Sequence, residues 1–104
     1  MDWIFLFVAG VLEIVWATGL KFTEGFTKFW PSVVTVLAMA ASVFLLAQAL
    51  RTIPVGTGYA VWTGIGAAGT AVAGIVLFSE SASLPRLASI AAIIVGIMGL
   101  KFTS

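Results

Sequence analysis

Four long apolar runs, separated by three short polar breaks, occupy nearly the whole chain. They cover residues 3–20, 30–50, 55–78 and 84–101, and a helix needs roughly 20 apolar residues to cross a bilayer. Strands of a membrane barrel would be about half as long and would alternate apolar and polar residues, which these runs do not. Because lipid satisfies no backbone polar group, the open-chain solution is helical. The pattern therefore predicts an all-α membrane protein, in which residues 1–104 form a single domain of four transmembrane helices.

The composition agrees with this prediction and excludes several kinds of function. The chain is 62% hydrophobic and only 9% charged, whereas soluble domains are about one quarter charged. It has no cysteine and no histidine, so we expect neither a disulfide framework nor a metal site. The net charge of +1 comes without a basic cluster, so no nucleic-acid partner is expected. No nucleophile–base pair is visible, which argues against an enzyme.

The positive charges in the polar breaks hardly favour one side of the membrane. Lys/Arg bias of short loops sets the orientation of a membrane protein. One side would carry Lys21, Lys28 and Arg86, and the other side Arg51 and Lys101. Such a balance fits a small protein that simply has few charges, and it equally fits a chain that inserts in both orientations.

The fourth apolar run carries small residues at helical spacing. Small residues three or four positions apart let helix backbones approach closely in lipid, where hydrophobic attraction between helices is absent. Small residues are also common in membrane helices in general. Because four short helices can hardly enclose a cavity alone, we expect an oligomer with a dimer contact on this stripe, formed by Ala88, Ala92, Gly96 and Gly99.

Glu13 is the acidic residue placed well inside an apolar run. A charge at the centre of a membrane helix costs about 2.5–3.5 kcal/mol on insertion scales. A neutral, hydrogen-bonded acid or a polar packing contact would explain it structurally, but serine or glutamine would provide such a contact at lower cost. Once ionised, a buried carboxylate needs a cation. Proton and cation then compete for one site, which is the minimum requirement for exchange across a membrane.

Polar and aromatic residues are expected around Glu13. Gly10 and Trp16 lie three positions from Glu13 and share its helix face. A hydroxyl buried in the second run needs a hydrogen-bond partner, and an acid is a natural one. In the third run, two aromatic residues three apart offer ring faces and hydrogen-bond donors. The predicted pocket and Glu-positioning residues are Gly10, Trp16, Ser42, Tyr59 and Trp62.

Glycines interrupt the middle of the third run. Each glycine inside a helix costs about 1 kcal/mol relative to alanine. Gly64 and Gly66 are therefore either positions of close helix packing or a hinge, since alternating access needs an element that bends.

Together these features resemble the small multidrug resistance family of four-helix transporters. The resemblance covers nearly the whole chain. It is carried by Glu13 with Lys21 eight residues later, by KFTEGFTKFWPS at 21–32, by YAVWTGIG at 59–66, and by the glycines of the fourth run. It implies an antiparallel, dual-topology homodimer with both glutamates in one shared site. It also implies proton-coupled cation export across the bacterial plasma (inner) membrane, with protons as the coupling ion and no other cofactor.

Within this family the chain resembles the guanidinium exporters. The distinguishing features are EIVWATGLK at 13–21, Lys101 in GLKFTS, and Met39 where the drug exporters usually have tyrosine. Lys101 is a marker of this subtype without an assigned role. The segment SESASLPR at 79–86 departs from the usual loop of the family. Guanidinium is planar and donates paired N–H bonds, so it suits two carboxylates and aromatic faces.

Two alternatives remain open. An exporter of hydrophobic quaternary ammonium cations would need a more adaptable, apolar site. A non-transporting membrane subunit would instead pair Glu13 with a lysine or arginine of a larger protein.

Overall fold

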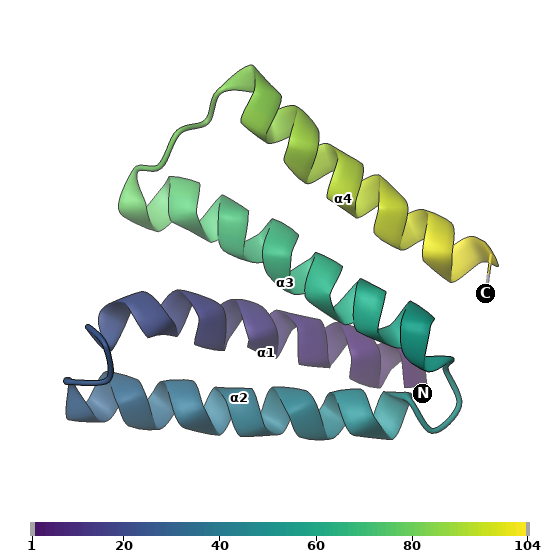
Figure 1. The fold of residues 1–104 in the computed structure, drawn as a ribbon, viewed down its shortest axis with the longest axis horizontal. Coiled ribbons are helices and arrows are strands. Elements are labelled where there is room, and N and C mark those ends of the chain that lie inside the picture. Colours follow the sequence, from purple (N-terminus) through teal and green to yellow (C-terminus); the bar gives the residue numbers. More distant parts are fainter. Residues whose placement is uncertain (1, 104) are drawn as a thin grey trace.

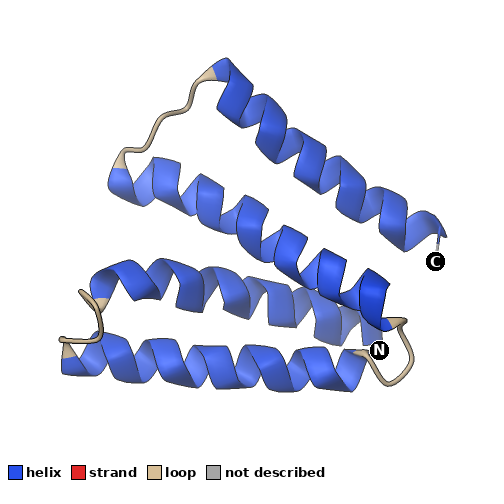
Figure 2. Cartoon of the chain, in the orientation of Figure 1, coloured by secondary structure: helices blue, strands red, loops and turns tan. Residues whose placement is uncertain are grey.

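Four α-helices follow one another in the computed structural model, which describes residues 2–103, and no strand occurs within that range. All four are long and apolar enough to cross a membrane, which confirms the expected helical spans. The expected ranges differ from the observed bounds by at most two residues. The helices, drawn in Figure 2, are α1 (Asp2–Phe22), α2 (Phe29–Ala49), α3 (Val55–Phe78) and α4 (Leu84–Thr103).

The turn between α1 and α2 is closed by a buried threonine. Thr23 is only 1% exposed. Its hydroxyl donates to the carbonyl of Leu20 at 2.7 Å and accepts from the backbone N–H of Phe26 at 3.1 Å. Gly25 adopts a φ of 74°, a conformation that glycine reaches without steric cost. These contacts reverse the chain, so that α2 returns alongside α1.

Seen from the side drawn in Figure 1, the helices follow one another in the order α2, α1, α3, α4, and α3 crosses in front of the N-terminal half of α1. Backbone contacts join α1 to α2, α1 to α3, and α3 to α4, with a minor contact between α2 and α3. The chain measures 40 × 34 × 17 Å, so even its shortest dimension exceeds the diameter of one helix, about 10 Å. Helix α1 begins and α4 ends at the same end of the molecule.

The buried core lies where α1, α2 and α3 meet. Among the described residues of α4 only Ile90 is buried, and that helix packs mainly against α3. Its small residues face outward, and a Cβ added at Gly96 or Gly99 would meet nothing within 4 Å. The stripe predicted as a dimer contact is thus unoccupied in one chain. The core cluster consists of Leu6, Ala9, Leu46, Ala49, Ile53, Val61 and Trp62.

Glycines allow α1 and α3 to approach closely. A Cβ at Gly10 would lie 2.7 Å from Ile65 Cγ2, and a Cβ at Gly69 would overlap Ile14. At these positions glycine makes room for a side chain of the facing helix, and Gly66 does the same for Glu13.

Candidate functional site

Glu13 sits near the middle of α1 and its side chain meets α3 at Gly66. A Cβ on residue 66 would overlap the Glu13 carboxyl group, so the carboxyl group lies directly against the α3 backbone. Its Oε1 atom is buried and makes no hydrogen bond within residues 2–103. An unsatisfied buried acceptor costs about 1–3 kcal/mol or more. The fold therefore leaves this carboxylate oxygen buried against α3 without a partner in the single chain.

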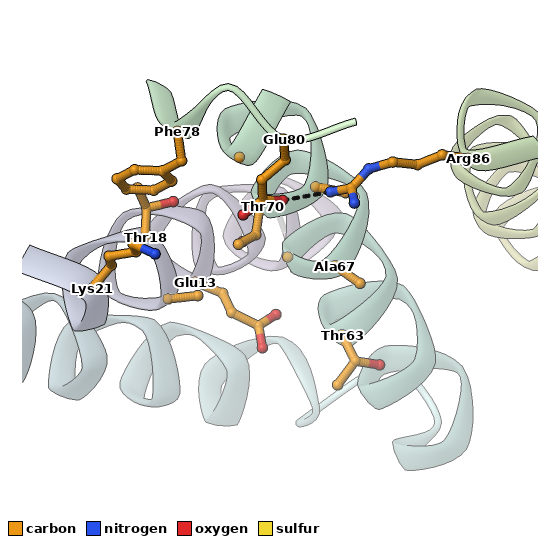
Figure 3. Close-up of a pocket in the computed structure, with 13 residues that line it drawn as sticks. Glu13, Thr18, Lys21, Thr63, Ala67, Thr70, Phe78, Glu80 and Arg86 are labelled. Carbon is orange, nitrogen blue, oxygen red and sulfur yellow. Dashed lines mark hydrogen bonds and ion pairs between the residues drawn. The ribbon is translucent and has the colours of Figure 1, made fainter. Parts of the chain in front are cut away.

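A cavity of about 480 Å³ extends from Glu13 between α1 and α3, within the size range of small-molecule sites. Glu13 and Thr63 lie at one end, and Phe78, Glu80 and Arg86 at the other (Figure 3). The remaining lining residues are Ala17, Thr18, Lys21, Gly66, Ala67, Thr70, Ala71 and Gly74.

Two threonine hydroxyls stand between the two ends of the cavity. The Oγ1 atoms of Thr18 on α1 and Thr70 on α3 are buried and have no hydrogen-bond partner among the described residues. In contrast, Thr63 donates to the backbone carbonyl of Tyr59 at 2.8 Å. Both Oγ1 atoms are enclosed by neighbouring atoms, so a water or small cation in the cavity would contact them only after the threonine side chains rotate.

Ser42 is completely buried and forms the polar centre of the three-helix core. Its hydroxyl donates to the carbonyl of Ala9 at 2.6 Å and accepts from the indole N–H of Trp62 at 3.0 Å. In the single chain the Ser42 hydroxyl therefore bonds to α1 and to Trp62 rather than to the expected acid, and its role in the predicted pocket stays a prediction. The physical reason is the rotation of α2, which turns Ser42 toward the core rather than toward the cavity.

The other predicted pocket residues divide between the core and the surface. Tyr59 and Trp62 do share a face, with ring centroids 5.6 Å apart, although Tyr59 is 56% exposed. The indole N–H of Trp16 is buried without a partner among the described residues. The space beside Gly10 is filled by Ile65, so Gly66, and not Gly10, makes room for the carboxyl group. None of these four residues lines the cavity of the single chain.

Comparison with known proteins identifies the family of the chain. A family model described as Small Multidrug Resistance protein matches residues 1–93. The chain belongs to the small multidrug resistance family. Its similar relatives include proteins named Guanidinium exporter from Yersinia pseudotuberculosis serotype I and Escherichia coli K12, each 60% identical over 104 residues, and from Proteus vulgaris, 58% identical. The matches cover this chain completely and 99–100% of the relatives.

The two glycines that were predicted as a hinge face different neighbours in this small multidrug resistance protein. A Cβ at Gly64 would lie 3.0 Å from Ile97 of α4, whereas Gly66 faces Glu13 of α1. Both therefore serve close packing, and their role as a hinge stays a prediction. The subtype marker Lys101 lies in the last turn of α4, and its Nζ is 5.0 Å from the ring centroid of Trp3 on α1.

Sequence reasoning missed the outer half of the cavity. Helical spacing from Glu13 would have indicated Ala17 and Lys21 on α1, since residues four apart share a face. The same spacing from Gly66 indicates Thr63 and Thr70 on α3. For the Glu80–Arg86 ion pair at the far end, the sequence contained the charges but no regular spacing that would predict their contact.

Proposed function

We propose that this protein exports guanidinium and small substituted guanidinium cations in exchange for protons. The observation that carries the proposal is the Glu13 carboxyl group, placed inside a membrane-spanning helix, at a cavity, with an unpartnered oxygen. The names of the relatives support the same substrate. The protein is then a secondary transporter rather than an enzyme, with protons as its coupling ion.

The exchange follows from the chemistry of one acid. A protonated Glu13 is neutral and leaves nothing for a cation to neutralise, while the ionised form binds a cation strongly in a medium of low dielectric constant. Guanidinium donates forked N–H pairs to carboxylates, which adds geometric selectivity to the charge. Proton and cation exclude each other, and exchange follows when the site changes sides only while one of them is bound.

We further propose that the working unit is an antiparallel, dual-topology homodimer in the bacterial plasma membrane. The outer face of α4 is exposed, and its small residues are free for a partner. The nearly equal Lys/Arg content of the two sides supports insertion in both orientations.

The test is guanidinium uptake by purified protein in proteoliposomes under a pH gradient. We expect Glu13→Gln to abolish pH-driven exchange, because the amide neither ionises nor takes up a proton. Glu24→Gln, the same chemical change at an exposed loop residue, should leave it intact. Persistent pH-driven exchange by Glu13→Gln would refute the proposal.

A competition arm separates the alternatives. Tighter competition by a bulky quaternary ammonium cation than by guanidinium would instead indicate a multidrug exporter. Absence of transport of either cation by the wild-type protein would favour a non-transporting subunit.

A further inference from the structure

An ion pair closes the end of the cavity that lies opposite Glu13. Arg86, in the first turn of α4, donates from Nη2 to Oε1 of Glu80 at 2.6 Å. The side chains are 34% and 42% exposed, respectively, so the pair sits between cavity and solvent (Figure 3). Lys21 lies nearby with its Nζ over the ring of Phe78, 5.2 Å from the centroid. Any cation that enters the cavity from this end meets Glu80 before it meets Glu13.

The backbone holds Glu80 in a defined position. Ser79 ends α3 with a left-handed φ of 55°, and the N–H of Glu80 donates to the carbonyl of Gly74 at 3.2 Å. The carboxyl group of Glu80 folds back onto α3 so closely that a Cβ on Gly74 would overlap it. Glycine on α3 thus makes room for an acid at both ends of the cavity: Gly66 for Glu13 and Gly74 for Glu80.

The chemistry of the pair matches that of the proposed substrate. The charged group of Arg86 is itself a guanidinium, so Glu80 already binds the ion that the protein is proposed to carry. The contact is incomplete: the pair makes a single hydrogen bond, and Nε of Arg86 is buried without a partner among the described residues. A free guanidinium ion can approach Glu80 with two parallel N–H groups, the stronger, forked arrangement.

We propose that Glu80 is an outer binding site for guanidinium on the path to Glu13, and that Arg86 is its resident occupant, displaced by the incoming ion. The substrate identity rests on the proposed function; the site itself rests on the geometry above. Arg86 keeps the outer carboxylate occupied when substrate is scarce. The ion that displaces it then has Thr18 and Thr70 between itself and Glu13.

The competition between Arg86 and free guanidinium for Glu80 determines the guanidinium concentrations that a test requires. A group tethered by a short flexible segment acts at an effective concentration on the order of millimolar, and Arg86 follows Glu80 by six residues. Free guanidinium should therefore displace Arg86 at millimolar to tens of millimolar concentration.

Arginine side-chain NMR measures this displacement directly. The chain contains only two arginines, Arg51 and Arg86, so ¹⁵N-arginine labelling gives two Nε–H signals. The titration uses guanidinium chloride against equal sodium chloride, on full-length Glu13→Gln protein in bicelles, which removes the inner site. We expect the Arg86 signal to shift with saturation while Arg51, hydrogen-bonded to Gln48, stays in place. In an added Glu80→Gln change, Arg86 should start unpaired and no longer respond.

Equal responses to sodium and guanidinium, or an unchanged Arg86 signal, would overturn the outer site. This result does not depend on transport. If wild-type protein moves no guanidinium in proteoliposomes, the proposed function fails while the titration still decides whether Glu80 binds the ion.

The KM for guanidinium transport gives a second measurement, in which substitutions of Glu80 and of Arg86 should act in opposite directions. Partly exposed ion pairs change equilibria by about two- to fivefold. Glu80→Gln should raise the KM for guanidinium by such a factor, and Arg86→Gln should lower it, because the competitor is gone. The exposed Glu24–Lys28 pair belongs to the turn between α1 and α2, which lies at the same end of the molecule as the connection between α3 and α4. Glu24→Gln and Lys28→Gln therefore control for surface charge. Changes of KM in the same direction for Glu80→Gln and Arg86→Gln would contradict displacement.

Discussion

Replacing Gly66 by alanine tests whether the position of the Glu13 carboxyl group determines cation binding. The new Cβ would overlap Oε1, Cδ and Cγ of Glu13, so the acid must rotate away or the two helices must separate. Overpacking of this kind costs about 1–3 kcal/mol, and the better helix propensity of alanine returns about 1 kcal/mol. We therefore expect a net loss of stability of roughly 0–2 kcal/mol, which leaves the protein folded.

The effect on binding should be larger than the effect on stability. A displaced carboxylate loses a hydrogen bond to a charged partner, which contributes about 1.5–3 kcal/mol. That range corresponds to about 10- to 150-fold weaker binding. The measurement is the KM for guanidinium in proteoliposomes at fixed pH gradient, together with the thermal stability of the purified protein.

Gly69→Ala is the matched control for this prediction. It lies one turn further along the same face of α3, and its Cβ would overlap Ile14, an apolar neighbour, instead of Glu13. Gly56→Ala, where a Cβ meets nothing within 4 Å, controls for helix propensity. If Gly66→Ala and Gly69→Ala raised KM equally, helix separation and not the carboxyl position would explain the loss, and the reasoning would be refuted.

Three further predictions concern the core, the free face of α4 and the effect of pH. Ser42→Ala should lower stability by about 0.5–2 kcal/mol, because the indole N–H of Trp62 loses its acceptor in a membrane interior; thermal unfolding and tryptophan fluorescence measure it, and an unchanged spectrum would contradict the hydrogen bond. Gly96→Leu should reduce chemical crosslinking of two copies in liposomes, whereas Gly56→Leu should not; equal crosslinking of both variants would argue against an α4 contact. Lowering the pH on the substrate side should raise the KM for guanidinium, since protonation of Glu13 removes the charge that the cation neutralises. The limit is about tenfold per pH unit for each competing proton, and a KM independent of pH would exclude direct competition.

The helices and the central acid could be predicted from the sequence because hydropathy alone determines them. An apolar run of about 20 residues has few alternatives to a membrane helix, and a carboxylate within such a run is costly wherever the helix turns. The pairing of Tyr59 with Trp62 followed from spacing within one helix. These predictions required no knowledge of how separate helices face one another.

Contacts between helices could not be predicted in the same way. An acid was the expected partner of Ser42, whereas in the single chain its hydroxyl meets Trp62 and the carbonyl of Ala9. Residue spacing defines a helix face but not the direction in which that face points. For the same reason Gly10 was assigned the space beside Glu13 that Gly66 provides. The pair of Glu80 and Arg86 depends on the path of an irregular segment, which has no periodicity to interpret.

The order of the helix contacts has a consequence for how the chain assembles during synthesis. Each helix after the first packs against one that has already left the ribosome: α2 and then α3 against α1, and finally α4 against α3. Ser42 can bond to the carbonyl of Ala9 within the α1–α2 hairpin before Trp62 emerges. Since chains fold from the N-terminus as they are made, no helix has to wait for a later one or be rearranged. The last helix to enter the bilayer is also the one whose outer face remains open, so the proposed association with another copy would follow directly upon completion of the chain.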